Sequence, residues 1–262
     1  MTWPCHWADR RISVGGLAIL MLVLAAALPA TAADIVVLTA GAFKPVLLDL
    51  APAFEASTHN TLAISNDTAG GVTARVVRDE QIDLVVLPMA AIDGLAGQGK
   101  IVAGSVVPVA KSGIGVVVKE GQPLPDISTV EAFKRTMLAA PTFAYIDPAS
   151  GGSSGIYLAQ LFDRLGIGEA LRRTAVLVPG GLVGSRVDDG EAAIGLQQMS
   201  ELRAVHGVTV VGPLPAEIQN YTVYAAGIPT AARRPAAARA LLEQLRGDAA
   251  VKALTLRGLE LP

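Results

Sequence analysis

Short apolar runs alternate with stretches of helical spacing along nearly the whole chain after residue 34. Residues 35–39 suit a fully buried parallel strand, and residues 45–56, with Pro45 in the first turn, suit a helix. A second alternating unit follows after two long extended runs. This pattern predicts an α/β fold of two doubly wound lobes with a cleft between them.

The expected elements follow this alternation. Strands are predicted at residues 35–39, 61–66, 84–87, 106–110, 114–119, 142–146, 175–178, 193–197, 208–211 and 221–227. Helices are predicted at residues 45–56, 72–78, 90–98, 129–138, after Ser154 as far as Gly166, 183–189, 231–246 and 249–256.

The stretch DPASGGSSG, residues 147–155, joins a predicted strand to a predicted helix. A helix start presents unpaired backbone N–H groups and a partial positive charge, and glycine allows a ligand to approach that backbone closely. The turn therefore suits an anion, although Ser153 or Ser154 could also serve only as a helix cap. Two further turns, residues 39–44 and 66–71, are built alike. Three such turns at matching positions favour anion binding over capping alone.

The first 33 residues show the three-part pattern of a secretory signal peptide. Arg10 and Arg11 precede an apolar run over residues 14–28, and small residues at 30–33 offer cleavage sites. The apolar and lysine positions usual in a twin-arginine signal are missing, which favours Sec export. Cys5 is the only cysteine of the chain. The mature chain then has no disulfide and no cysteine metal ligand, as expected for a bacterial periplasmic protein.

Charge and motifs exclude several classes of function. Without Asp9, Arg10 and Arg11, the chain keeps 19 basic and 22 acidic residues, and no basic stripe suggests nucleic acid as a partner. The sequence has no HExxH, no paired His/Cys spacing, no GxSxG and no Walker motif. We therefore expect neither a metal nor a cofactor, and a monomer that binds a small anion.

The mature chain resembles the periplasmic molybdate-binding-like solute-binding proteins of ABC transporters. The resemblance rests on residues 37–42, 70–75, 83–86, 147–166 and 190–195, of which the block at 147–166 is the most specific. It implies a type 2 periplasmic-binding fold (Venus flytrap), with lobe 1 at residues 34–112 plus 224–262 and lobe 2 at 113–223. The crossings would fall near 111–118 and 220–227, and an ABC permease would be the partner.

The departures from this family point away from molybdate. Where molybdate binders carry serine in the first and second turns, this chain has Ala42 and then Ala69, Gly70 and Gly71, and Gln198 replaces their tyrosine. Each lost hydroxyl costs a buried anion roughly 1–2 kcal/mol. The two glycines suggest room for a larger ligand, and the amides of Gln197 and Gln198 suit an organic di- or tricarboxylate.

Basic residues near the predicted helix starts are candidates to clamp a carboxylate. Lys44 and Arg75 would do so from lobe 1 and Arg186 from lobe 2, although each also fits a solvated surface charge. The expected ligand-binding set is Gly41, Ala42, Lys44, Ala69, Gly70, Gly71, Arg75, Gly152, Ser153, Ser154, Gln197 and Gln198.

One branch of the family offers an alternative to binding alone. Residues 151–155, 197–202 and 212–215 resemble elements of aconitate isomerases, periplasmic enzymes that interconvert trans- and cis-aconitate. This reaction moves a proton allylically and needs a positioned base. The main expectation is a solute-binding protein for ABC-type uptake, with isomerisation in the same cleft as the alternative.

The candidates for such a base are few. Lys44, Asp67 and Glu201 lie nearest the predicted cleft, together with Tyr157 and Asp147, but an aspartate before proline more often forms a turn. His59 and His206 fall in predicted loops away from the three turns and are expected at the surface. The sequence does not choose among these candidates.

Overall fold

The computed structural model describes residues 1–3 and 34–262. The predicted signal peptide, with Cys5, therefore lies outside the described residues except for its first three. Among the described residues, none of the helices is both long and apolar enough to cross a membrane.

In the part of the chain that the structure describes, ten strands form two five-stranded sheets. The first sheet has the order β2-β1-β3-β10-β4, in which β1 runs parallel to β2 and β3 while β10 runs antiparallel to both of its neighbours. Its strands are β1 (Asp34–Ala40), β2 (Thr61–Asp67), β3 (Leu84–Pro88), β4 (Val107–Ser112) and β10 (Thr222–Gly227).

The second sheet repeats this plan in the order β7-β6-β8-β5-β9. Strand β6 runs parallel to β7 and β8, and β5 runs antiparallel to both of its neighbours. Its strands are β5 (Ile114–Lys119), β6 (Phe143–Ile146), β7 (Ala175–Val178), β8 (Ile194–Gln198) and β9 (Val208–Pro213). The two α/β lobes predicted from the sequence are confirmed.

The chain passes between the sheets twice. It leaves β4 and enters β5 through the single residue Gly113, and it returns from β9 to β10 across residues 214–221. We propose that these passages mark the lobe boundaries that the sequence places after residues 112 and 223. Below, lobe 1 and lobe 2 denote the elements built on the first and second sheets.

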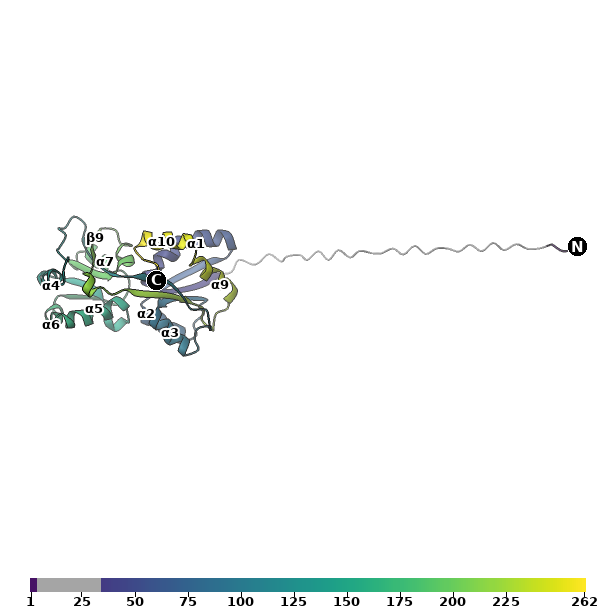
Figure 1. Cartoon of the computed structure of the whole chain (residues 1–262), viewed down its shortest axis with the longest axis horizontal. Coiled ribbons are helices and arrows are strands. Elements are labelled where there is room, and N and C mark those ends of the chain that lie inside the picture. Colours follow the sequence, from purple (N-terminus) through teal and green to yellow (C-terminus); the bar gives the residue numbers. More distant parts are fainter. Residues whose placement is uncertain (4–33) are drawn as a thin grey trace. The chain divides into compact units, whose positions relative to one another are not determined.

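Helices cover both faces of each sheet. In lobe 1, α1 and α10 lie side by side over one face and α2 and α3 over the other (Figure 1). The helices are α1 (Lys44–Thr58), α2 (Ala69–Val77), α3 (Met89–Gly97), α4 (Val130–Ala139), α5 (Ser153–Arg164), α6 (Gly168–Leu171), α7 (Val183–Asp188), α8 (Met199–Leu202), α9 (Pro235–Gln244) and α10 (Asp248–Arg257). Three short 3-10 helices are η1 (Gly41–Phe43), η2 (Pro148–Ser150) and η3 (Ala216–Ile218).

Side-chain alternation along the central strands builds the cores. In lobe 2, Phe143 and Tyr145 of β6 pack into the core on one face, whereas Ala144 and Ile146 belong to the core on the other. The lobe 1 core is one large cluster that includes Leu241 and Leu254 of the C-terminal helices. The end of the chain is thus part of lobe 1.

One predicted helix begins later than expected. The sequence predicts a helix over residues 231–246, but α9 begins at Pro235. The residue before a proline is pushed out of the helical region, and Arg234 has φ −126° and ψ 55°. The N–H groups of Arg233 and Arg234 instead donate to Asp83 Oδ1, each at 2.9 Å, which ties this loop to lobe 1.

Candidate functional site

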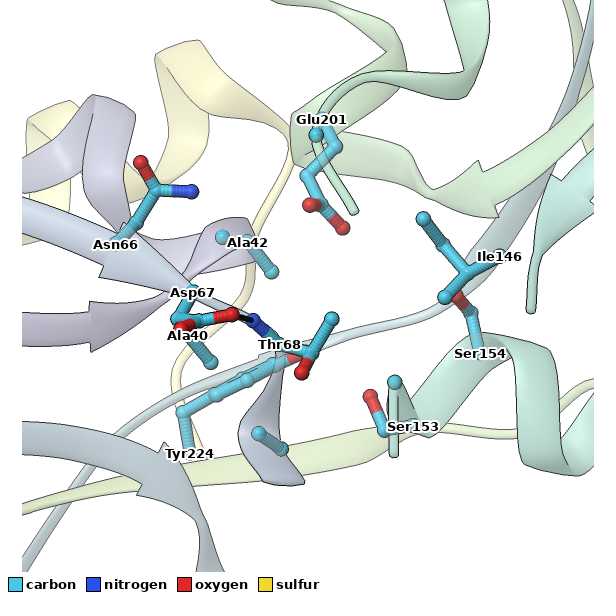
Figure 2. A pocket seen from close by; sticks show the side chains of 14 residues that line it. Ala40, Ala42, Asn66, Asp67, Thr68, Ile146, Ser153, Ser154, Glu201 and Tyr224 are labelled. Carbon is cyan, nitrogen blue, oxygen red and sulfur yellow. Dashed lines mark hydrogen bonds between the residues drawn. The ribbon is translucent and has the colours of Figure 1, made fainter. Parts of the chain in front are cut away.

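A cavity lies where the strand-to-helix turns of both lobes meet (Figure 2). We call it the cleft cavity. Its lining residues are Ala40, Gly41, Ala42, Asn66, Asp67, Thr68, Ala69, Ile146, Gly152, Ser153, Ser154, Gly181, Glu201 and Tyr224. All three Gly/Ser-type turns therefore contribute to one cavity, at the carboxyl ends of β1, β2 and β6.

The turn after β6 is held by Asp147. Its Oδ1 accepts the N–H of Ala149 at 2.9 Å, and its carbonyl accepts the N–H of Ser150 at 3.0 Å. Asp147 is thus the turn former that the sequence favoured. Helix α5 then starts at Ser153, and the N–H groups of its first turn have no partner within the helix. Ser153 and Ser154 add hydroxyl groups beside these N–H groups.

The turn after β1 faces the cavity with backbone alone. It forms η1 and leads directly into α1, so Gly41 and Ala42 offer N–H groups but no hydroxyl. Lobe 2 contacts this turn directly, because Ser200 Oγ donates to the carbonyl of Ala42 at 2.7 Å. The lobes are therefore joined at the edge of the cavity.

Backbone N–H groups of the turn after β2 already donate hydrogen bonds to oxygen atoms of the chain itself. Asp67 Oδ1 accepts the N–H of Thr68 at 2.7 Å, and Thr68 Oγ1 caps α2 by accepting the N–H of Gly71 at 3.1 Å. The N–H of Gly70 donates to the carbonyl of Gly151 in lobe 2 at 3.2 Å. The space that the sequence assigned to a larger ligand at Gly70 and Gly71 is thus filled by Gly151 and by the Asp67 carboxylate.

Glu201 places a carboxyl group inside the cavity. It belongs to the short helix α8 of lobe 2, is only 9% exposed, and points into the cavity opposite Thr68 and Ala42 (Figure 2). Its carboxyl occupies the place that a side chain on Gly41 would take. Burial raises the pKa of Glu201 to about 8, and a hydrogen bond with Gln197 opposes only part of the rise. Glu201 therefore holds a proton over much of the neutral pH range.

Tyr224 enters the cavity from β10, the strand that returns to lobe 1. The residue is 1% exposed. Burial, followed by the negative charge of Glu201, raises the pKa of the Tyr224 hydroxyl well above its ordinary value, while hydrogen bonds with Ser153 and Thr222 act in the opposite sense. The hydroxyl thus stays protonated and can donate a hydrogen bond.

The three basic candidates do not line the cleft cavity. Arg75 pairs with Glu80 at 2.6 Å, and Arg186 pairs with Glu191 at 3.0 Å. Lys44 Nζ donates to Asn66 Oδ1 at 2.9 Å and faces a neighbouring cavity. A negatively charged ligand in the cleft cavity would therefore be stabilised by backbone N–H groups and hydroxyls rather than by a cationic side chain.

The two glutamines form internal hydrogen bonds. Gln197 Oε1 accepts the N–H of Val183 at 2.7 Å, and its Nε2 donates to the carbonyl of Gly181 at 2.9 Å, so it fixes the start of α7. Gln198 satisfies both amide atoms when its Nε2 donates to the carbonyls of Ser112 and Gly113 and its Oε1 accepts from Thr222 Oγ1. Gln198 thus ties the two interlobe passages together.

The remaining candidates lie elsewhere. His59 and His206 are exposed, and the Tyr157 hydroxyl donates to the carbonyl of Ile218 at 2.8 Å. Six lining residues were named neither as ligands nor as bases, although the first three lie in the predicted turns: Ala40, Asn66, Thr68, Ile146, Gly181 and Tyr224. A tyrosine in the predicted crossing segment was the available signal for Tyr224. Across residues 1–3 and 34–262, no three His, Cys, Asp or Glu side chains gather as metal ligands would.

Comparison with known proteins places this chain in a family. The model of the bacterial extracellular solute-binding protein family matches residues 35–260. The chain is 36% identical over 255 residues to an aconitate isomerase from a Pseudomonas species, and the match covers 95% of each chain.

Solved structures show the same fold. The periplasmic molybdate-binding protein of Azotobacter vinelandii has a TM-score of 0.74 at 21% identity, over 87% of this chain and 99% of that one. A periplasmic thiamin binding protein has a TM-score of 0.67 at 15% identity, over 86% and 81%. The two five-stranded lobes and these solved structures show the type 2 periplasmic-binding fold. Because the family model matches residues 35–260, the chain belongs to the bacterial extracellular solute-binding protein family.

Proposed function

We propose that this protein isomerises aconitate, interconverting the trans and cis forms in the cleft cavity. The observation that carries the proposal is Glu201, a buried carboxyl with a pKa of about 8 inside a cavity built for an anion. A carboxyl group that is largely protonated but ionises near neutral pH can both give and take a proton inside the cavity, and capture of a ligand alone does not need such a group. A proton-transfer enzyme requires such a group. The 36% identical relative is named for the same reaction.

The reaction needs one proton donor and acceptor and no oxidant. A base removes a proton from the methylene carbon of aconitate, and the electron pair spreads over the allylic carbons and the attached carboxylates. The proton then returns to the carbon that was vinylic, and the double bond moves by one position. Because the carbon skeleton is symmetric, the product is again aconitate. Its cis or trans geometry depends on how the protein holds the carboxylates.

Glu201 suits both halves of this transfer. With a pKa of about 8, roughly a tenth of the free protein carries the ionised base at pH 7, and the protonated remainder can return a proton. The rate of the enzyme at low substrate should therefore rise between pH 6 and 8. Of the three candidate bases, Asp67 already accepts the N–H of Thr68, and Lys44 faces the neighbouring cavity.

The rest of the cavity would hold the substrate and its intermediate. The N–H groups at the starts of η1 and α5 and the hydroxyls of Ser153 and Ser154 are donors for carboxylate oxygens. Removal of the proton adds negative charge to the allylic carbons and to the oxygens of the attached carboxylates, and fixed donors stabilise that charge best in a site closed to water. The protonated Tyr224 hydroxyl supplies a further donor.

Capture of an organic anion for ABC-type uptake in the periplasm is the second candidate. It is favoured by the family and by the hydrogen bonds that join the lobes over the cavity, Ser200 to Ala42 and Thr68 to Ser150. Such a protein would work as a monomer that delivers its ligand to a permease, with the predicted signal peptide directing export. It would bind without turnover.

Proton NMR of trans-aconitate with a catalytic trace of protein separates the two candidates. We expect cis-aconitate to accumulate over many turnovers, and Glu201→Gln to abolish turnover while trans-aconitate still binds. Glu217→Gln, at an exposed position of the same lobe, is the matched control and should remain active. Tight binding of trans-aconitate by the wild type without conversion would reject the isomerase and favour solute capture.

A further inference from the structure

A second cavity adjoins the cleft cavity, and Glu201 lines both of them. We call it the Lys44 cavity. Gly41, Asn66, Gly181 and Glu201 line both cavities. The two cavities are therefore adjacent and have these four residues in common.

Lys44 is the cation of this cavity that lacks an acidic partner. It is half-buried at the start of α1, and its ammonium donates to Asn66 Oδ1 at 2.9 Å. Within residues 34–262, no carboxylate lies within ion-pair distance of it. A lysine ammonium has three N–H donors, so two remain for another acceptor.

Arg257, the other cation of the cavity, is already neutralised. Its guanidinium binds both oxygens of Asp49, at 2.7 and 2.6 Å. The remaining wall includes the apolar side chains of Pro45, Leu48 and Leu182. A lone ammonium beside such a wall attracts an anion more strongly than an ammonium surrounded by water.

Asn66 links this lysine to the cleft cavity. Because its Oδ1 accepts from Lys44, its amide nitrogen points the other way, toward the cleft (Figure 2). A carboxylate near Glu201 can therefore meet the Asn66 amide on one side and the Lys44 ammonium on the other. The cleft cavity itself holds the carboxyls of Asp67 and Glu201, which makes it poor in compensating charge for a third substrate carboxylate.

We propose that the Lys44 cavity is a subsite for one carboxylate of a tricarboxylate whose other two carboxylates occupy the cleft cavity. The identity of the ligand rests on the function proposed above. Lys44 then determines specificity for three carboxylates over two, and Asn66 positions its ammonium.

The test compares trans-aconitate with three dicarboxylates that each lack one of its carboxylates: itaconate, glutaconate and mesaconate. Calorimetric dissociation constants are measured for the wild type, Lys44→Met, Lys44→Arg and the exposed control Lys252→Met. We expect Lys44→Met to weaken trans-aconitate at least tenfold and to leave one of the dicarboxylates, the one lacking the Lys44-bound group, within twofold of the wild type. Lys44→Arg should restore part of the affinity, and Lys252→Met should change nothing.

Other outcomes overturn the subsite. Equal weakening of all four ligands by Lys44→Met would mean a general electrostatic or folding effect, and an unchanged affinity for trans-aconitate would leave Lys44 without a role. The NMR assay separates this proposal from the function: conversion without a Lys44 preference rejects the subsite alone, whereas binding with that preference but no conversion rejects the isomerase alone. No binding of trans-aconitate rejects both.

Discussion

Gly70 of lobe 1 and Gly151 of lobe 2 meet backbone to backbone. A Cβ atom on Gly151 would lie 2.8 Å from the Cα of Gly70, and a Cβ on Gly70 would lie 3.1 Å from the Cα of Gly151. The N–H of Gly70 also donates to the carbonyl of Gly151. The closed arrangement of the lobes thus depends on two residues without side chains.

Replacing Gly70 by alanine should separate closure from folding. Alanine favours the helix α2 by roughly 0.5–1 kcal/mol, so the protein should unfold at the same temperature or slightly higher. The added methyl group crowds Gly151 and Ser150, so ligand affinity should fall about tenfold. Gly94→Ala in helix α3, where a Cβ meets nothing within 4 Å, is the control and should keep full affinity. Calorimetry and thermal unfolding measure both quantities, and unaltered affinity in Gly70→Ala would contradict this role.

The stability of the ligand-free protein should fall as pH rises through the range set by Glu201. Below about pH 4.5 the carboxyl is protonated in both folded and unfolded chains, so it has no effect. Between the unfolded value of 4.5 and the folded value of about 8, only the unfolded chain ionises, and the free energy of unfolding decreases. The full loss is on the order of 3–5 kcal/mol and levels off above pH 8.

Glu201→Gln isolates this contribution because it removes the ionisable group with little change in shape. The variant should equal the wild type near pH 4 and exceed it increasingly toward pH 8.5. Urea unfolding of both proteins at four pH values measures the difference. If the free energies of unfolding of the two proteins changed with pH in parallel, the pKa of Glu201 would be the same in the folded and unfolded chains.

Loss of both serine hydroxyls at the start of α5 should weaken ligand binding without unfolding the chain. The double variant Ser153→Ala, Ser154→Ala removes two donors from the cleft cavity, each worth about 1–2 kcal/mol to a buried anion. The dissociation constant for trans-aconitate should rise at least tenfold, with an unchanged circular dichroism spectrum. Unaltered affinity in a folded double variant would remove these serines from the site.

Asp83 should be a stability residue with no role in the cleft. It is 3% exposed and accepts the backbone N–H groups of Val36, Arg233 and Arg234, so it ties β1 to the loop before α9. Asp83→Ala leaves three donors without their acceptor and should cost about 3 kcal/mol of unfolding free energy. Asp79→Asn, which breaks an exposed pair with Lys100, should cost less than about 1 kcal/mol. Equal effects in chemical denaturation would contradict the buried role.

The fold was largely predictable from the sequence because its central strands are buried on both faces. The apolar runs at residues 84–87 and 114–118 fall within β3 and β5, and the Gly/Ser turn after β6 begins a helix as predicted. The short helix α8 was missed, since four residues show no helical period. This short helix determines which carboxyl group enters the cleft cavity, because it carries Glu201.

The site residues were harder to predict from the sequence than the fold, because the partners of side chains depend on tertiary contacts. Arg75 and Arg186 were candidate anion ligands, yet each lies in the last turn of its helix and pairs with an acid five residues further along, Glu80 or Glu191. Gln198 takes the place of a ligand in the family resemblance, but its amide serves the interlobe passages. Tyr224 reaches the cavity from a strand 71 residues after Ser153, and spacing along the chain does not predict that approach.

Strand β10 also determines which of the two sheets can be completed first while the chain is synthesised. It is the neighbour of both β3 and β4 in the first sheet, yet it is made of residues 222–227, after every strand of the second sheet. A chain emerging from its N-terminus therefore has all of the second sheet available by residue 213, while β3 and β4 keep open edges until β10 arrives. The lobe that begins first in synthesis is the last to close its sheet, and its exposed strand edges need protection from aggregation during that interval.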